Sequence, residues 1–124
     1  MRRAKPSFVV ACGVALTAGW VFVVSASGLS ASELYLECCA QCHGKTGHGD
    51  GPSANGLPVQ PRNFTDCKTM VGIPDAVLFK AIKQGGAAVG LQDSMPSWEA
   101  ALDDPQIREL IQYIRQFCNS SADG

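Results

Sequence analysis

The stretch Cys39–His43 constrains this chain more than any other, because it is the C-x-x-C-H pattern of covalent haem attachment. On a helix, residues three and four positions apart share one face, so Cys39, Cys42 and His43 can reach one flat ligand together. The two thiols can add to the haem vinyl groups as thioethers, and the imidazole can bind the iron. We therefore predict one haem c, bound covalently through two thioethers, with these three residues binding the cofactor.

The N-terminus has the layout of a secretory signal. Arg2, Arg3 and Lys5 precede an apolar run over residues 8–24, and small residues follow it. We assign residues 1–32 to a signal peptide. The run is also close to the minimum length of a membrane span, so an uncleaved N-terminal membrane anchor is the alternative. Both interpretations predict a periplasmic domain, soluble or tethered to the outer face of the cytoplasmic membrane.

Residues 33–119 form the predicted folded domain, and residues 120–124 a flexible tail. The chain after residue 32 carries seven basic and eleven acidic residues, a formal net charge of −4. Such a surface does not suit nucleic acid or anionic lipid, so we expect redox protein partners with a basic docking patch. Membrane contact is expected only if the N-terminal segment stays uncleaved. A domain this small needs help to complete its core, and a buried porphyrin would supply it.

The first predicted helix leads into the haem motif, and a long irregular segment follows it. A capping box of Ser30 and Glu33 opens the helix, which we expect to end at His43. Residues 44–72 are rich in Gly and Pro, which predicts turns rather than regular elements. An irregular stretch of this length is unusual unless it wraps a ligand, and haem is the predicted ligand here.

Two further helices are predicted downstream. One starts at Pro74, as its first helical residue, and ends before Gly85 and Gly86. The other starts with Asp104 as its N-cap and repeats apolar residues at helical spacing. A loop over residues 87–98 joins them, and no stretch alternates like a strand.

Over residues 31–117 the chain resembles class I c-type cytochromes of the bacterial monohaem type. The resemblance rests on the haem motif with Gly44 and on four blocks in the family's order, which are Gly47-His48-Gly49-Asp50-Gly51-Pro52, Pro61-Arg62-Asn63-Phe64-Thr65-Asp66, Ser94-Met95-Pro96-Ser97-Trp98 and Tyr113-Ile114-Arg115. It implies an all-α fold, in which helices and long loops wrap around one covalently bound haem. It also implies that the first and last helices cross, with Tyr35 and Tyr113 near the crossing.

The resemblance further implies a second iron ligand, a methionine sulfur from a late loop. A thioether is a good sixth ligand for low-spin iron, and Met95 precedes Pro96 in a loop far from the haem motif. We therefore predict that His43 and Met95 bind the metal. Gap filling in the core is the alternative role of Met95. We expect Met70 to be a packing residue and His48 a solvated loop residue.

Four other residues are candidates to support the haem. A ligating imidazole normally donates its second N–H to a fixed acceptor, and the resemblance suggests the backbone carbonyl of Pro52. Arg62 and Asn63 are candidates for hydrogen bonds to the haem propionates, with a solvated arginine as the alternative. Trp98 is predicted either to donate its indole N–H near the haem edge or to pack in the core.

Three cysteines after residue 32 are not needed by the haem. In an exported protein an odd remainder suggests one disulfide and one further thiol. A bridge between Cys67 and Cys118 is the favoured pairing, although the sequence alone does not fix whether it forms. Haem attachment through Cys38 instead of Cys39 is an alternative to the three-residue spacing, and the sequence assigns Cys38 no other role.

The predicted function is one-electron transfer by a low-spin His/Met haem c that shuttles electrons between periplasmic or membrane redox partners, without enzymatic activity of its own. The alternative is a haem c subunit of a larger membrane or periplasmic oxidoreductase. A five-coordinate haem enzyme or sensor would require that Met95 does not bind the iron. A thioredoxin-like dithiol lacks its βαβ pattern here, and a zinc site lacks a second ligand pair.

Overall fold

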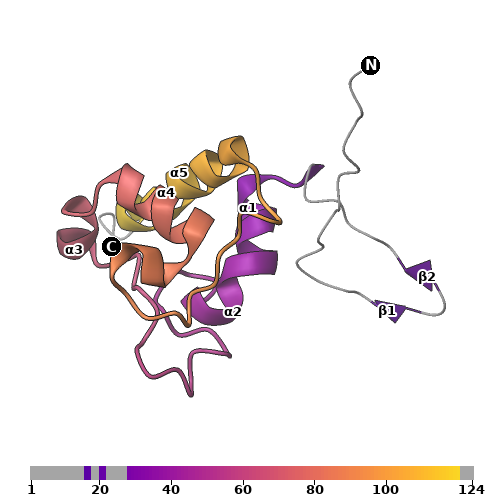
Figure 1. Cartoon of the computed structure of the whole chain (residues 1–124), viewed down its shortest axis with the longest axis horizontal. Helices are drawn as coiled ribbons and strands as arrows, with labels where there is room; N and C mark the ends of the chain where they lie inside the picture. Colours follow the sequence, from indigo (N-terminus) through magenta and orange to yellow (C-terminus); the bar gives the residue numbers. More distant parts are fainter. Residues whose placement is uncertain (1–15, 18–19, 22–27, 121–124) are drawn as a thin grey trace.

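The structure is a computed structural model that describes residues 16–17, 20–21 and 28–120, with side chains from 28 to 119. From residue 28 onward it is an all-α domain (Figure 1), as predicted. In chain order the elements are β1 (Leu16–Thr17), β2 (Trp20–Val21), α1 (Ala31–Leu34), η2 (Tyr35–Cys39), α2 (Ala40–His43), α3 (Cys67–Val71), α4 (Asp75–Gln84), η3 (Gly86–Val89) and α5 (Asp104–Ser120).

The predicted signal segment and tail fall mostly outside the described residues. Where the segment is described, β1 and β2 form an antiparallel ladder of two residues each, which the sequence did not predict. No helix in the described ranges is long and apolar enough to cross a membrane. The choice between a cleaved signal and an anchor therefore stays a prediction.

The first helix runs from Ala31 to His43, as predicted, but changes its pitch midway. The predicted capping box is present, since the Glu33 N–H donates to Ser30 Oγ at 3.4 Å and the Ser30 N–H donates to the Glu33 carboxylate at 2.8 Å. η2 is a π-helix, and α2 then resumes the α-helix as far as the haem motif. A π-turn inserts one extra residue into a helix and is frequent at functional sites.

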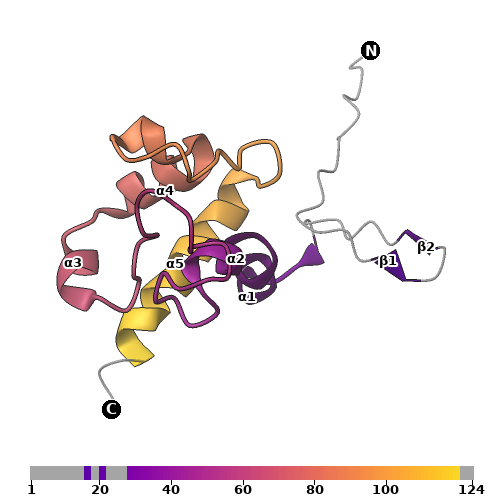
Figure 2. The ribbon, with the colours of Figure 1, turned by 90° about the horizontal axis from the view of Figure 1, so that it is seen from below.

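α5 crosses the first helix, and most of the core lies between these helices and α4 (Figures 1 and 2). The buried face of α5 repeats at helical spacing and consists of Ile107, Leu110, Ile111 and Ile114. At the crossing, the rings of Tyr35 and Tyr113 lie 5.3 Å apart, where the resemblance implied them. Leu78 and Ile82 of α4 complete this core.

The irregular segment after α2 contains one short helix. Asp66 caps α3, because its carboxylate accepts hydrogen bonds from the Thr69 N–H at 3.3 Å and from Thr69 Oγ1 at 2.6 Å. The prediction of turns throughout residues 44–72 is wrong at this point. The N-cap signal of this helix is a single aspartate, and the Gly and Pro residues around it favoured a prediction of turns instead.

The starts of α4 and α5 each differ from the prediction by one residue. Pro74 is the N-cap of α4 rather than its first helical residue. In α5 the capping box is formed by Asp103, whose carboxylate accepts from the Gln106 N–H at 2.9 Å, while Gln106 Oε1 accepts from the Asp103 N–H at 3.0 Å. Asp104 therefore is not the N-cap, because Asp103 has the partner three residues later that a capping box needs.

Candidate haem site

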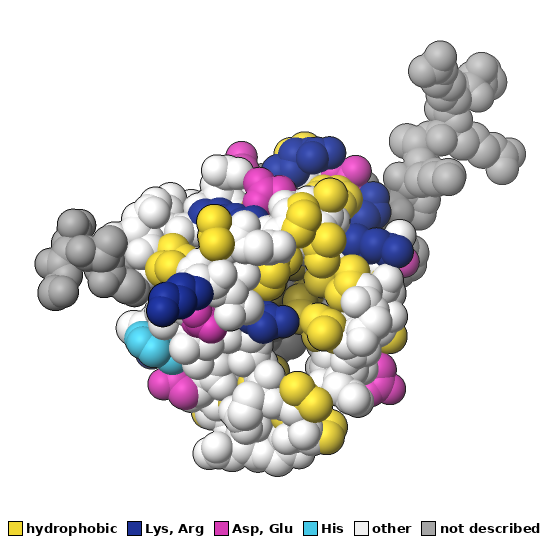
Figure 3. All heavy atoms as spheres, turned by 90° about the vertical axis from the view of Figure 1, so that its left-hand side faces the viewer, with side chains coloured by type: hydrophobic (Ala, Val, Ile, Leu, Met, Phe, Trp, Pro, Cys, Tyr) yellow, Lys and Arg dark blue, Asp and Glu magenta, His cyan; other side chains and the backbone are white. Residues whose placement is uncertain are grey.

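A cavity of about 530 Å³ lies between the end of α2 and the loop that follows η3. Its lining comes from the haem motif, from residues 57–63 of the irregular segment and from residues 90–98. Figure 3 shows a hollow lined by hydrophobic side chains on one face of the molecule. The volume is within the range of about 300–1,000 Å³ that is usual for ligand pockets. The fold thus brings three stretches that are distant in sequence around one space.

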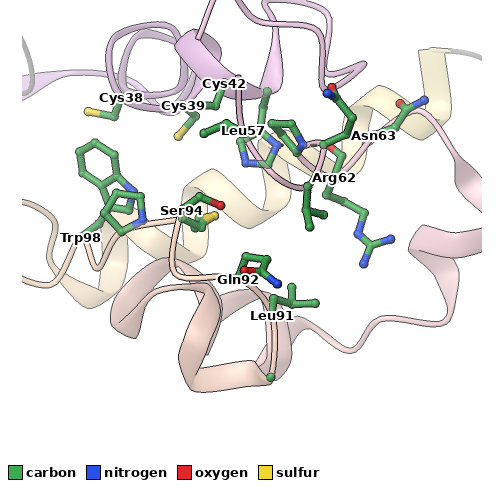
Figure 4. A pocket seen from close by; sticks show the side chains of 17 residues that line it. Cys38, Cys39, Cys42, Leu57, Arg62, Asn63, Leu91, Gln92, Ser94 and Trp98 are labelled. Carbon is green, nitrogen blue, oxygen red and sulfur yellow. Dashed lines mark hydrogen bonds between the residues drawn. The ribbon is translucent and has the colours of Figure 1, made fainter. Parts of the chain in front are cut away.

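All the predicted cofactor-binding residues line this cavity, namely Cys39, Cys42, His43 and Met95. In the close-up of Figure 4, Cys42 and Gln92 lie on facing walls. The motif residues come from the end of the first helix, and Met95 comes from the loop between η3 and α5. The structure therefore places the two predicted iron ligands around the same space.

Cys39 and Cys42 are half-buried free thiols. Burial, with a smaller contribution from Cys42, raises the pKa of the Cys39 thiol to about 12. A thioredoxin-type dithiol needs a lowered thiol pKa to attack disulfides, so this environment does not favour that chemistry. Within the described ranges, no three His, Cys, Asp or Glu side chains gather as a metal-binding group.

Cys38 is buried and also lines the cavity. Figure 4 shows the Cys39 sulfur directed into the space between the walls, whereas the Cys38 sulfur is directed to its side. This geometry favours Cys39 over Cys38 as the partner of Cys42 in haem attachment.

His43 is buried and oriented by the backbone of the irregular segment. Its Nδ1 donates a hydrogen bond to the Arg62 carbonyl oxygen at 3.1 Å, and its ring stacks on Phe64 with a centroid distance of 4.5 Å. The prediction that Pro52 supplies this carbonyl is wrong, because the segment folds back on the imidazole ten residues later. Burial lowers the pKa of His43 despite this hydrogen bond, so the imidazole is neutral and Nε2 carries the lone pair that iron needs.

Glycine turns hold the end of α2 in place. The N–H groups of Gly49 and Gly51 donate to the carbonyl oxygens of His43 and Cys42, at 2.8 and 3.1 Å. A Cβ on Gly51 would collide with the carbonyl oxygens of the helix end, so only glycine fits there. The buried hydroxyl of Tyr35 donates to the Gly44 carbonyl oxygen at 2.8 Å. The last carbonyl groups of the motif helix are thereby satisfied without solvent.

The Met95 wall is fixed to the end of α4. The Gly86 N–H donates to the Met95 carbonyl oxygen at 2.9 Å, and the Trp98 N–H donates to the Ile82 carbonyl oxygen at 3.1 Å. Ser97 Oγ donates to the Lys83 carbonyl oxygen at 2.7 Å. The last two bonds satisfy carbonyl groups that the end of α4 leaves open, and all three hold the loop that carries Met95.

The predicted supporting residues Arg62, Asn63 and Trp98 all line the cavity. Figure 4 shows Trp98 at one end and Arg62 at the other. The Asn63 side-chain oxygen already accepts hydrogen bonds from the N–H and Oγ1 of Thr65, at 2.9 and 2.7 Å. Asn63 therefore shapes the loop through its oxygen, and only its NH₂ group can face a ligand.

His48 and Met70 lie away from the cavity, as expected. His48 is exposed and hydrogen-bonded to Thr46, and Met70 is fully buried in the core. Sequence reasoning missed Phe64 as a stacking partner of His43 and Gly86 as the anchor of the Met95 loop. Phe64 belongs to one of the four blocks that carry the resemblance, and Gly86 belongs to the pair Gly85-Gly86. Neither residue type, however, indicates which residue it will contact in the fold.

The residues around the cavity fit a haem. The donor set combines a neutral imidazole, a thioether and two thiols at helical spacing. Most of the remaining wall is apolar, through Leu57, Val59, Leu91, Pro96 and Trp98. At one end of the cavity, the Arg62 side chain provides a cation that suits a haem propionate carboxylate. The apolar wall suits the flat face of the porphyrin.

The family model of cytochrome c oxidase, cbb3-type, subunit III, matches residues 26–114. The chain belongs to this family. The chain is 34% identical to the cbb3-type cytochrome c oxidase subunit FixP of Bradyrhizobium diazoefficiens over 82 residues. The match covers 66% of this chain and 24% of that protein. To the cbb3-type subunit CcoP of Azospirillum brasilense it is 33% identical over 81 residues, 65% of this chain and 25% of that protein. The chain thus spans about a quarter of the length of these relatives.

Among solved structures, the KustC0563 c-type cytochrome matches with a TM-score of 0.58 and 24% identity, covering 72% of this chain and 98% of that one. This likeness concerns the fold alone. With the family match, it confirms the predicted class I c-type cytochrome and its all-α fold, and the cbb3 family implies haem c as the cofactor. These relatives are named as subunits of cbb3-type cytochrome c oxidases, which agrees better with the predicted oxidoreductase-subunit alternative than with a free shuttle.

Proposed function

We propose that this domain holds one haem c through Cys39 and Cys42, with His43 and Met95 as axial ligands, and relays single electrons as part of a cbb3-type oxidase. The observation that supports it most is that the haem motif and Met95, which are more than fifty residues apart, line one cavity. The diffusible shuttle is the second candidate. In either setting the domain is a relay and performs no catalysis of its own.

Each residue has its own task. When bound, the haem iron gains and loses one electron at a potential set by its axial ligands and burial. His43 presents Nε2 because the Arg62 carbonyl oxygen occupies its other nitrogen. Met95 would hold the iron through its thioether sulfur and so leave no place for a substrate. The apolar wall would limit access of water to the haem, and thioethers formed by Cys39 and Cys42 would prevent its loss.

We further propose that the domain works on the periplasmic side of the membrane. The C-x-x-C-H motif after an apolar N-terminal run supports this, since both cleavage and anchoring export the domain. A net charge of −4 after residue 32 suits a partner with a basic docking patch. Redox encounters of this kind use small interfaces, so docking would centre on the cavity rim.

Expression of the full chain in a bacterium that matures c-type cytochromes tests the haem assignment. We expect a red protein whose intact mass includes one haem, and a haem-bearing peptide that contains Cys39 and Cys42. The Cys38→Ser variant should keep this attachment, whereas Cys39→Ser should lose one thioether. Colourless protein with the mass of bare polypeptide would overturn the proposal, and attachment at Cys38 would overturn the choice of cysteine.

Membrane fractionation separates the two candidate functions. In a bacterium that makes a cbb3-type oxidase, a tagged full chain should migrate with the catalytic oxidase subunit on a native gel after mild detergent extraction. The haem-free Cys39→Ser/Cys42→Ser variant tests whether association needs the mature domain. A soluble monomer in the periplasmic fraction, with no oxidase bound, would reject the subunit proposal and favour the shuttle.

A further inference from the structure

Among the described residues, the two cysteines outside the cavity lie next to each other. Cys67 opens α3 and Cys118 lies near the end of α5, 51 positions further along the chain. Cys67 Sγ is 3.4 Å from the carbonyl oxygen of Cys118. Both are half-buried free thiols in this structure. The fold thus brings together the pair that the sequence favoured for a bridge, in the reduced form.

The thiols are held by the segment that supports His43. Cys118 Sγ donates to the Phe64 carbonyl oxygen, and Cys67 Sγ donates to the Thr65 carbonyl oxygen, both at 3.4 Å. A thiol is a weak donor, so bond formation between the two sulfurs would cost little in hydrogen bonding. The segment is fixed at its other side, where the Phe64 N–H donates to the Gly47 carbonyl oxygen at 2.7 Å.

We propose that Cys67 and Cys118 form a reversible disulfide that ties the segment at residues 64–67 to the end of α5. This rests on the proposed export to the periplasm, where disulfides form and persist. The oxidant is a disulfide, either of a thiol oxidase protein or of a small molecule. One thiolate attacks it to give a mixed disulfide, and the second thiolate displaces the remaining thiol. The Cys67–Cys118 bond forms, the S–S bond of the oxidant breaks, and the two S–H protons pass through solvent to the leaving thiolates, so that the oxidant gains two electrons and two protons as two thiols.

The bridge would act on the orientation of His43. Phe64 stacks on the imidazole, and Arg62, two residues earlier, supplies the carbonyl that accepts the Nδ1 hydrogen bond. Closing the bridge adds a covalent link between this segment and α5, whereas opening it leaves weak thiol hydrogen bonds and the stacked rings of Phe64 and Phe117 there. The thiol state would therefore change the stability of the domain and how rigidly His43 is held.

Peptide mapping tests the bridge directly. Trypsin cuts after Arg62, Lys68 and Arg115, so Cys67 and Cys118 fall in separate peptides with no other cysteine. Holoprotein is equilibrated with oxidised glutathione, alkylated and digested without reduction. We expect a cross-linked pair of the peptides that begin at Asn63 and Gln116, which dithiothreitol separates. Two separately alkylated or glutathionylated peptides would overturn the proposal. The haem is read on the peptide of Cys39 and Cys42, so its absence would count against the proposed function and not against the bridge.

Thermal unfolding tests the effect on the domain. A bridge across a loop of this length should raise the midpoint of the oxidised wild type over the reduced form by on the order of 10 °C. With the haem iron held in one oxidation state, the Cys67→Ser/Cys118→Ser variant should resemble the reduced wild type and show no shift between thiol-oxidising and thiol-reducing buffer. A cross-link without any difference in the midpoint or in the reduction potential of the haem would overturn the proposed action on the site.

Discussion

His43 and Met95 differ in how firmly their surroundings hold them. His43 is buried, stacked on Phe64 and hydrogen-bonded to the Arg62 carbonyl oxygen. Met95 is only partly buried, and its hydrogen bond to the Gly86 N–H is made by its backbone carbonyl group. At the scale of single residues, the methionine side of the proposed haem is therefore the side that a substitution opens most easily.

Met95→Ala should leave the sixth position of the iron open, so that cyanide and carbon monoxide bind quickly. Met70→Leu is the matched control, because it alters a core methionine while conserving volume and should cost less than about 1.5 kcal/mol of unfolding free energy. Stopped-flow ligand binding and the near-infrared sulfur-to-iron band report the change. Slow ligand binding in Met95→Ala, as in the wild type, would contradict the axial assignment.

The reactivity of Cys118 should depend steeply on pH. Burial raises the pKa of its thiol to about 11, and the Cys67 thiol and the Asp66 carboxylate add to this, while the Arg115 guanidinium opposes it. Below the pKa the thiolate fraction grows tenfold per pH unit, so alkylation of reduced protein should accelerate about tenfold from pH 8 to 9 and again to pH 10.

Peptide-resolved rates with iodoacetamide measure this profile. Cys67→Ala removes a contribution that raises the Cys118 pKa, so its profile should move to lower pH. A wild-type rate that levels off near pH 8.5, the range of an ordinary thiol, would show that the site does not perturb Cys118.

At this scale the sequence predicted side chains well and backbone partners poorly. Cys39, Cys42 and His43 were predicted from their spacing and Met95 from the resemblance, and all four line the cavity. The acceptor for His43 was placed at the wrong residue, because every residue has a carbonyl group and no side chain marks the one that the fold selects.

The end of α4 is the element that positions the Met95 loop. A Cβ on Gly86 would collide with the Gln92 carbonyl oxygen and come within 3.2 Å of the Met95 Cβ. Gly86→Ala should therefore push the loop away, cost about 1–3 kcal/mol of unfolding free energy and weaken the methionine–iron bond. Thermal unfolding and the near-infrared band measure the two effects.

Gly72→Ala is the matched control for this substitution. Its backbone φ is −80°, and an added Cβ would meet only the Thr69 carbonyl oxygen at 3.5 Å, an ordinary contact. It should leave the iron band unchanged and alter the unfolding free energy by less than about 1 kcal/mol, in the stabilising direction. Equal effects of the two substitutions would show that Gly86 has no special role.

Helices with caps and apolar repeats were predictable as elements, and their fine structure was not. The capping box at Ser30 and the stop at Gly85 are local signals, and the structure contains both. The π-turn of η2 and the short α3 depend on how the chain packs against α5 and around the cavity. Propensity within a window of a few residues does not report such tertiary constraints.

The whole domain is built around a space that its own side chains do not fill. A domain of this size buries little apolar surface, so a ligand that fills the cavity contributes to folding directly. His43→Ala should therefore abolish stable, coloured holoprotein. Far-UV circular dichroism and the yield of coloured protein are the measurements, and His48→Ala is the control, because that exposed imidazole lies outside the cavity. A normal yield of folded, coloured His43→Ala protein would contradict the expectation.

The π-turn of η2 changes the direction in which side chains point in the second half of the first helix relative to the first half. One additional residue rotates everything after it by roughly 100° about the helix axis. Leu34 and Tyr35 can then stay buried while Cys39 aims its sulfur into the cavity. Deleting one residue from this turn would restore an even pitch, and the helix could then keep either its inward-facing contacts or the aim of its thiols, but not both.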